Sequence, residues 1–319
     1  MGGAHIQSKC IGANVSITAC TTELRERNLE PQRAQQIATL LTNVEKAYRR
    51  KCFRFLMGED VSFSQGWQDW YVFHNVFGDR LTWGAGVYLD VGANHPTSTS
   101  NSLFFDKCLG WRGVCFEMNP IYHTLIREKR SCTLVPSCVL GSASLVVYQG
   151  SGQDRKVSVL HNASAGNGPQ SAGEHRCVVA GETLARLGIE KVDFMTIDIE
   201  GSEANVLRCW PFHRLAPTAL LMETSIDGGR GGRVNIREVD RFFHRHGYAN
   251  VESFATARVS TAPIWTDNLY VRRLAVYPKV AYPSKLSCDR DFAGHRSWWC
   301  VPWIQWEPTS KLWGECRGE

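Results

Sequence analysis

Two acids that each end an apolar run are the residues of this chain best suited to chemistry. Asp90 follows the run 87–89, and Glu117 follows the run 113–116. In an open α/β sheet, ligands bind at the carboxyl ends of the strands, and a carboxylate has two acceptor oxygens for the two hydroxyls of a ribose. Gly92, in the turn after the first run, lets the backbone approach a ligand closely. The pair therefore predicts a site for an adenosine-containing cofactor, rather than two buried strands followed by ordinary turns.

The turn after Asp90 discriminates between such cofactors. A nicotinamide-dependent enzyme carries G-x-G-x-x-G directly after its first strand, whereas here Gly84-Ala85-Gly86 precedes the run and the turn reads Val91-Gly92-Ala93-Asn94-His95-Pro96. No Gly-Lys-Ser or Gly-Lys-Thr follows an apolar run, so the sequence also lacks a phosphate-binding P-loop. A cofactor without a pyrophosphate fits better. S-adenosylmethionine is such a molecule, and a nicotinamide oxidoreductase is disfavoured.

A third apolar run, 192–197, ends in the acidic segment 198–203. Together the three runs resemble the FkbM family of S-adenosylmethionine-dependent methyltransferases, and the resemblance covers residues 61–275. The segments that carry it, in the family's order, are 64–69 (Ser-Gln-Gly-Trp-Gln-Asp), 90–96, 100–102, 110–114, 117–120, 198–203, 221–223, 246–248 and 267–271. His95-Pro96 stands where the family often has Asp-Gly, and it resembles a variant found in one branch of the family.

The resemblance implies an α/β fold of the Rossmann-like class I methyltransferase type, with a mostly parallel seven-stranded sheet and helices on both faces. The alternation of strand-like and helix-like segments indicates the same kind of sheet. Strands are expected at 87–91, 113–117, 133–139, 144–148, 176–179, 193–198, 218–223, 248–253 and 267–272. Helices are expected at 66–76, 100–108, 120–128, 181–187, 202–208 and 235–246. The segments 133–139 and 144–148 are expected to form a hairpin, and 150–173 a loop over the active site.

The segments outside this core predict two appendages. The chain divides into an N-terminal segment (1–60), a methyltransferase domain (61–275) and a Trp- and Cys-rich extension (276–319). Apolar residues at three- and four-residue steps predict one amphipathic helix over 29–56, packed on the core; a partner-binding or membrane-surface helix is the alternative. The extension is expected to wrap its own core, or else to dock on a protein partner, because indole rings are favoured anchors at interfaces.

The expected cofactor contacts follow from the resemblance and from the strand ends. The residues expected to bind the cofactor are Asp90, Gly92, Ala93 and Asn94 at the methionine end, Glu117 at the ribose, Met118 and Ser142 at the adenine, Asn101 between the first turn and its helix, and Asp198 between cofactor and substrate. For Asn94 and Asn101, capping a helix is an equal alternative.

The expected reaction is a direct displacement in which a substrate hydroxyl attacks the sulfonium methyl group. The positive sulfur already activates the methyl group, so alignment is the main task of the protein. A hydroxyl must also lose its proton, which calls for a general base. The candidates are His95, Asp198, Glu200 and His161, and the choice among them is open. The alternative role of His95 is to shape the turn before Pro96.

Composition restricts the class of protein and its location. A formal net charge of +5 and a hydrophobic content of 43% are ordinary for a globular chain. They call for no nucleic acid, although the charge favours an acidic substrate such as a sugar nucleotide. No apolar run is long enough to span a membrane and no secretory signal is visible. A cytoplasmic location is therefore expected, with import into an organelle left open.

The chain has twelve cysteines but no C-x-x-C pair, so neither a zinc ribbon nor a redox motif is expected, and no metal ligand is assigned. Cys115, Cys138 and Cys209 lie in apolar contexts and are expected to be small core residues. The cysteines of the extension, Cys288, Cys300 and Cys316, could form a disulfide or, with His295, bind a metal. Two Asn-x-Ser sequons, at Asn14 and Asn162, are interpreted as chance matches.

The sequence as a whole predicts an S-adenosylmethionine-dependent O-methyltransferase that acts on a hydroxyl of a carbohydrate or another small metabolite. A catalytically silent subunit with the same fold, kept for a structural or docking role in a larger assembly, is the alternative. The retained acids Asp90, Glu117 and Asp198 favour the enzyme, because a scaffold has no need of cofactor-binding carboxylates.

Overall fold

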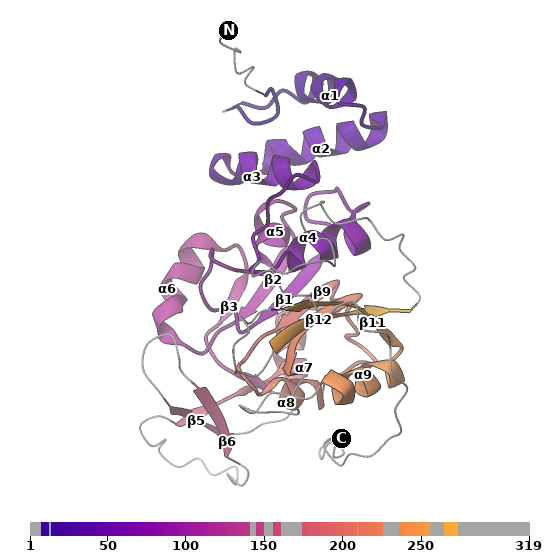
Figure 1. Ribbon diagram of the computed structural model, residues 1–319. Coiled ribbons are helices and arrows are strands. Elements are labelled where there is room, and N and C mark those ends of the chain that lie inside the picture. Colours follow the sequence, from indigo (N-terminus) through magenta and orange to yellow (C-terminus); the bar gives the residue numbers. More distant parts are fainter. Residues whose placement is uncertain are drawn as a thin grey trace.

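A seven-stranded sheet in the order β11-β12-β10-β9-β1-β2-β3 forms the centre of the molecule (Figure 1). The computed structural model describes residues 8–12, 14–140, 145–149, 156–160, 174–208, 210–225, 236–255 and 265–273. The strands of the sheet are β1 (Val87–Val91), β2 (Arg112–Phe116), β3 (Thr133–Val135), β9 (Phe194–Ile197), β10 (Ala219–Ser225), β11 (Tyr248–Ala255) and β12 (Trp265–Arg272). All pairs are parallel except those made by β12, which lies antiparallel between β10 and β11. The expected Rossmann-like, mostly parallel seven-stranded sheet is confirmed.

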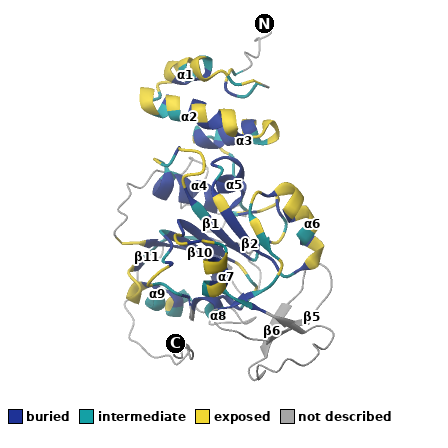
Figure 2. Cartoon of the chain, turned by 180° about the vertical axis from the view of Figure 1, so that it is seen from behind, coloured by how far each residue is buried: buried dark blue, intermediate teal, exposed yellow. Residues whose placement is uncertain are grey.

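Each face of the sheet buries its own apolar core. Successive side chains of a strand point to opposite faces, so Tyr88 enters one core while Leu89 and Val91 enter the other. The helices that contribute to the first core are α1 (Ile17–Glu26), α2 (Pro31–Asn43), α3 (Lys46–Leu56), α4 (Gln68–Val72), the π-helical η1 (Phe73–Phe77), α5 (Leu103–Lys107) and α6 (Pro120–Lys129). Those of the second core are α7 (Ala180–Arg186), α8 (Glu203–Arg208) and α9 (Ile236–Arg245). The five inner strands are accordingly buried from both sides, whereas the edge strands β3 and β11 are only partly buried (Figure 2).

The amphipathic segment 29–56 is two helices and not one. Val44, between α2 and α3, is extended and buried, so the chain turns there while the apolar spacing continues through the break. The buried guanidinium of Arg49 donates from Nε to the carbonyl of Leu41 (3.0 Å) and from a terminal nitrogen to that of Val44 (2.8 Å). These bonds satisfy carbonyls that the end of α2 leaves without helical partners.

The three N-terminal helices stack as a layer on one end of the core (Figure 1). The ring of Phe55 in α3 stacks on that of Phe104 in α5, with centroids 3.8 Å apart. A disulfide joins Cys52 of α3 to Cys108 just after α5. The helical segment therefore packs on the core, as expected, and does so through α5.

The expected hairpin between 133–139 and 144–148 is wrong. The chain leaves the sheet after Val135, whose carbonyl accepts from the amides of both Glu117 and Ser137. The short strand β4 (Val139–Leu140) then pairs in parallel with β8 (Val178–Val179). A separate small sheet consists of β5 (Leu145–Gln149), β6 (Lys156–Leu160) and β7 (Glu174–Arg176). β5 lies in its middle and pairs with β6 and β7, not with 133–139 (Figure 1). The expected loop 150–173 thus contains a strand, and its other residues lie outside those described.

Four disulfides link the described part of the chain. The pairs are Cys10–Cys20, Cys52–Cys108, Cys115–Cys132 and Cys138–Cys177. Cys115 and Cys138 lie buried or half-buried in apolar surroundings, as expected, but each also forms a disulfide, which was not expected. Cys209, the cysteines of the extension and the Trp-rich segment itself lie outside the described residues.

We predict that replacing Cys52 and Cys108 by alanine lowers the free energy of unfolding by about 4 kcal/mol, because the disulfide closes a long loop in the unfolded chain. The sequence separation is 56 residues for this pair and 10 for Cys10–Cys20. All four cysteines of the two pairs are fully buried. Urea unfolding of the oxidised proteins measures the effect.

The matched control is the Cys10→Ala/Cys20→Ala protein, for which the shorter loop predicts a loss of about 3 kcal/mol. Equal free energies of unfolding for wild type and the Cys52→Ala/Cys108→Ala variant would show that α3 is not tied covalently to α5.

Candidate active site

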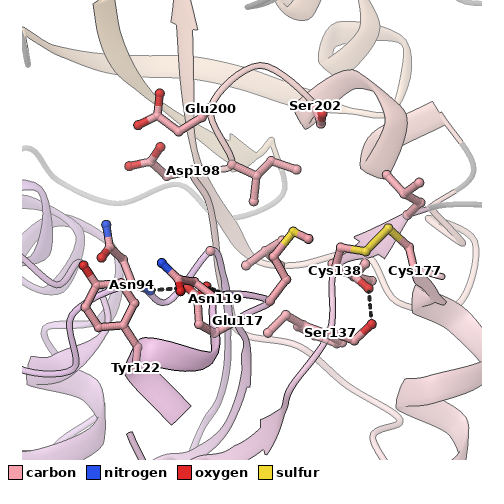
Figure 3. A pocket seen from close by; sticks show the side chains of 17 residues that line it. Asn94, Glu117, Asn119, Tyr122, Ser137, Cys138, Cys177, Asp198, Glu200 and Ser202 are labelled. Carbon is pink, nitrogen blue, oxygen red and sulfur yellow. Dashed lines mark hydrogen bonds between the residues drawn. A yellow bond between two sulfur atoms is a disulfide. The ribbon is translucent and has the colours of Figure 1, made fainter. Parts of the chain in front are cut away.

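Two adjoining cavities open at the carboxyl ends of β1, β2 and β9. The first has a volume of about 140 Å³ and the second of about 280 Å³. Lining residues shared by both are Gly92, Asn94, Asp198 and Glu200. Figure 3 shows the first cavity, with Glu117 and Asn94 on one side and the Cys138–Cys177 disulfide on another. The cavities lie where an open α/β sheet binds its ligands.

The turn after β1 brings three strand ends together through backbone alone. Gly92 has a φ of +89°, and a Cβ at this position would stand 1.9 Å from the carbonyl oxygen of Asp198. The amides of Gly92 and Ala93 both donate to the carbonyl of Phe116, at 3.0 and 3.1 Å. The turn therefore requires glycine for two reasons, a left-handed conformation and a close approach of the strand end beside it.

Glu117 lies at the end of β2 and faces the first cavity. One carboxylate oxygen accepts from the amide of Asn94 (2.7 Å) and the other from the amide of Asn119 (2.6 Å) (Figure 3). Burial raises the pKa of this carboxyl, and the two amides act in the opposite direction. Each carboxylate oxygen has a further lone pair. Glu117, with Met118 beside it in the lining, can therefore still accept ligand hydroxyls.

Asp90 lies at the end of β1 and lines the second cavity. Its carboxylate accepts from the hydroxyl of Ser102 (2.5 Å) and lies 3.5 Å from the guanidinium of Arg130. Burial raises the pKa of Asp90, and the charge of Arg130 counteracts this. Arg130 is fully buried and also donates to Asp106 at 2.6 Å. One carboxylate oxygen of Asp90 is thus engaged by Ser102 and Arg130, and the residue also lines the second cavity.

Acids dominate the second cavity. Asp198 reaches into the open cleft from the end of β9, while Glu223 of β10 and Asp267 of β12 are buried behind it. Burial among these groups, and then the charges of Glu223 and Asp267, raise the pKa of Asp198. Asp198 is solvent-accessible through the cleft, although protein surrounds it on its other sides. No Lys, Arg or His stands among the described residues that line either cavity.

Of the remaining residues predicted from the sequence that the structure describes, only Asn101 is found in the lining of a cavity. Asn101 lines the second cavity and donates to the hydroxyl of Thr196 at 3.4 Å. His95 lines neither cavity: its Nδ1 accepts from the amides of Thr97 (3.3 Å) and Ser98 (3.1 Å), the turn-shaping role considered as its alternative. Ser142 and His161 fall outside the described residues.

Several lining residues were missed from the sequence. Glu223 and Asp267 stand inside segments that carried the family resemblance, yet they were assigned only to strands. An acid within an otherwise apolar strand is itself a signal, because burying it is costly without a partner. Gln68, the first residue of α4, was also missed. Its side-chain amide donates a hydrogen bond of 2.6 Å to the carboxylate of Asp267. The Cys138–Cys177 pair gave no comparable signal, since its pairing depends on the tertiary fold.

One family model matches this chain. The model of the methyltransferase FkbM domain matches residues 90–249, half of the chain. No curated protein sequence is significantly similar to this chain. Among solved structures, the methyltransferase FkbM from Methylobacillus flagellatus KT is 12% identical with a TM-score of 0.39, and the match covers 84% of this chain and 63% of that one.

Two further structures are similar at the same low level. Precorrin-6y C5,15-methyltransferase from Geobacter metallireducens GS-15 is 16% identical with a TM-score of 0.32, over 60% of this chain and 82% of that one. The 1,6-didemethyltoxoflavin-N1-methyltransferase of Burkholderia thailandensis is 11% identical with a TM-score of 0.33, over 59% and 71%.

We predict that Gly92→Ala weakens binding of S-adenosylhomocysteine at least about tenfold, because the new methyl group must push the end of β9 out of the cleft. Strain at a positive φ alone costs about 1–3 kcal/mol of stability. The matched control is Gly188→Ala, where φ is +63° and a Cβ meets nothing within 4 Å. Calorimetric titration measures the affinity and thermal unfolding the stability. Equal affinities for wild type and Gly92→Ala would contradict the geometry of this turn.

Proposed function

The chain belongs to the FkbM family of S-adenosylmethionine-dependent methyltransferases, and we propose that it transfers the methyl group to a hydroxyl oxygen of a carbohydrate or another small metabolite. The observation that carries the proposal is the pair Asp198 and Glu200, which line both cavities and whose carboxylates point the same way (Figure 3). Carboxylates at that point suit an acceptor that must lose a proton.

The residues present fit the cofactor. Glu117 offers acceptor oxygens at the end of β2, and Met118 and the Cys138–Cys177 disulfide provide an apolar wall beside it. We therefore assign the nucleoside half to the first cavity and the amino-acid half to the turn 92–94, where the two cavities meet. When bound, S-adenosylmethionine supplies a methyl group on a positively charged sulfur. The acceptor then belongs in the second cavity.

The protein's own part is to align the acceptor and to take its proton. Burial and neighbouring negative charges raise the pKa of Asp198, which makes it a stronger base than an ordinary carboxylate. It lies where both cavities meet, whereas His95 has its Nδ1 engaged in a turn outside them. We therefore favour Asp198 as the general base, with Glu200 beside it to orient the acceptor.

The disulfides bear on where this chemistry takes place. Within the described residues no helix has the length and apolar character needed to cross a membrane. Four disulfides are typical of proteins in oxidising compartments and rare in the cytosol. We propose that the chain works in an oxidising compartment, in place of the cytoplasmic location expected from the sequence.

We predict that Glu117→Gln weakens binding of S-adenosylhomocysteine about 10- to 100-fold, because hydrogen bonds to a charged acceptor contribute about 1.5–3 kcal/mol. The control is Glu128→Gln, an exposed acid of α6 outside both cavities, which should bind like wild type. Isothermal titration calorimetry gives the dissociation constants. Failure of the wild-type protein to bind at all would support the alternative of a catalytically silent subunit.

For the reaction itself, we predict that Asp198→Asn lowers kcat by about 100-fold or more, the usual contribution of a general base. Its affinity for S-adenosylhomocysteine should change much less, provided that the main nucleoside contacts lie at Glu117. The assay is transfer of a labelled methyl group to panels of sugar nucleotides and glycans, with amines and thiols as competing acceptors. Methylation confined to nitrogen or sulfur would rule out the hydroxyl acceptor.

A further inference from the structure

Three carboxylates converge behind the mouth of the second cavity. Asp198 follows β9, Glu203 begins α8 and Glu223 lies in β10, and an oxygen of each lies within 4.8 Å of an oxygen of the other two. Oxygen ligands of a hard cation stand about 2.0–2.6 Å from it, so two of them can be about 4–5 Å apart across the ion. The three groups are therefore close enough to share one cation.

Glu203 gives an independent indication that a ligand is needed. Its side chain is fully buried, and one oxygen accepts from the amides of Ile199 (3.1 Å) and Gly201 (3.0 Å). The other oxygen, Oε2, has no hydrogen-bond partner in the described part of the chain. A buried carboxylate oxygen without a partner costs free energy that the fold must recover elsewhere. A bound cation would satisfy this oxygen.

The charges around the cluster point the same way. Glu223 and Asp267 are direct cross-strand partners in the antiparallel pair of β10 and β12. Like charges in this relation destabilise a sheet. Gln68 donates to Asp267, but an amide carries no net charge. No basic side chain stands among the described residues that line the second cavity, so a cation bound there would meet a predominantly acidic lining.

From these observations we infer that Asp198, Glu203 and Glu223 bind a hard divalent cation, such as Mg²⁺, Mn²⁺ or Ca²⁺, at the acceptor end of the cleft. Carboxylate oxygens suit these ions, whereas zinc and copper sites are richer in imidazole and thiolate. Three protein ligands leave coordination positions for water and for one more oxygen. The site adds a metal to a chain whose sequence gave no expectation of one.

The role of the cation rests on the proposed function. An acceptor hydroxyl that coordinates a divalent cation loses its proton more readily. Asp198 binds the cation through one carboxylate oxygen, and its other oxygen takes the hydroxyl proton. The acceptor oxygen forms a bond to the methyl carbon, and the carbon–sulfur bond breaks with both electrons left on sulfur. Atoms and charge balance without a further reactant. The cation thus selects acceptors that present an oxygen ligand.

The test titrates the protein with Mn²⁺ and follows the electron paramagnetic resonance signal of the free ion, which is lost when the ion binds to protein. We predict that the wild type binds one Mn²⁺ per chain. The Mn²⁺ affinity should be at least about tenfold lower in Glu203→Gln and in Glu223→Gln, because loss of a residue that only supports a metal ligand already lowers metal affinity by about 10–100-fold. Glu203→Gln keeps an oxygen to accept from the two amides. Glu190→Gln, an exposed acid outside the cluster, is the matched control.

S-adenosylhomocysteine binding, measured separately without metal, distinguishes failure of this inference from failure of the proposed function. Loss of the Mn²⁺ site in both variants, with thermal unfolding and cofactor affinity close to wild type, supports the metal site. Normal cofactor binding with no Mn²⁺ site in the wild type, or Mn²⁺ binding unchanged in both variants, overturns it. A wild type that binds Mn²⁺ but no cofactor would instead overturn the methyltransferase function.

Discussion

The candidate site depends on one buried charge, the guanidinium of Arg130. It donates to Asp106 and to the hydroxyl of Ser102, both at 2.6 Å, and it lies 3.5 Å from the carboxylate of Asp90. Asp106 lies in α5, Ser102 is the residue just before α5, and Asp90 lies near the end of β1, while Arg130 is the residue that follows α6. Removing one partner of such a group leaves an unpaired buried charge, which commonly costs about 3–5 kcal/mol. The network therefore fixes the end of β1, from which the turn that lines both cavities begins.

A firmly held strand end explains how the fold tolerates strained backbone around the cleft. Asn94, Thr99 and Glu200 all have left-handed φ values, between +47° and +59°, and all three line the second cavity. Such conformations are rare for residues other than glycine and persist only where the surroundings impose them. Here the surroundings are the Arg130 network at the end of β1 and the acids that line the second cavity. A cleft shaped in this way keeps the carboxylates of Asp198 and Glu200 directed into the cavities.

The sequence predicted those parts of the fold whose signals are local. Apolar runs ending in acids located the strands that carry Asp90 and Glu117, and the ordered motifs gave the family. Features that depend on tertiary contacts could not be predicted from the sequence. The three- and four-residue apolar spacing continues through the break at Val44, so one helix was predicted where two exist. The pairing of Cys138 with Cys177, and the cross-strand pairing of two acids from β10 and β12, join residues whose proximity the sequence does not reveal.

The disulfide between Cys138 and Cys177 also has an evolutionary consequence. It closes a separation of 39 residues with its two Cα atoms 4.6 Å apart, beside the paired strands β4 and β8. The intervening stretch therefore enters and leaves the domain at one clamped point on the cavity wall. Lengthening such a stretch adds little closure entropy, about 0.6 kcal/mol for each doubling. It can accordingly diverge, acquiring insertions or new surface chemistry, while the wall of the first cavity keeps its shape.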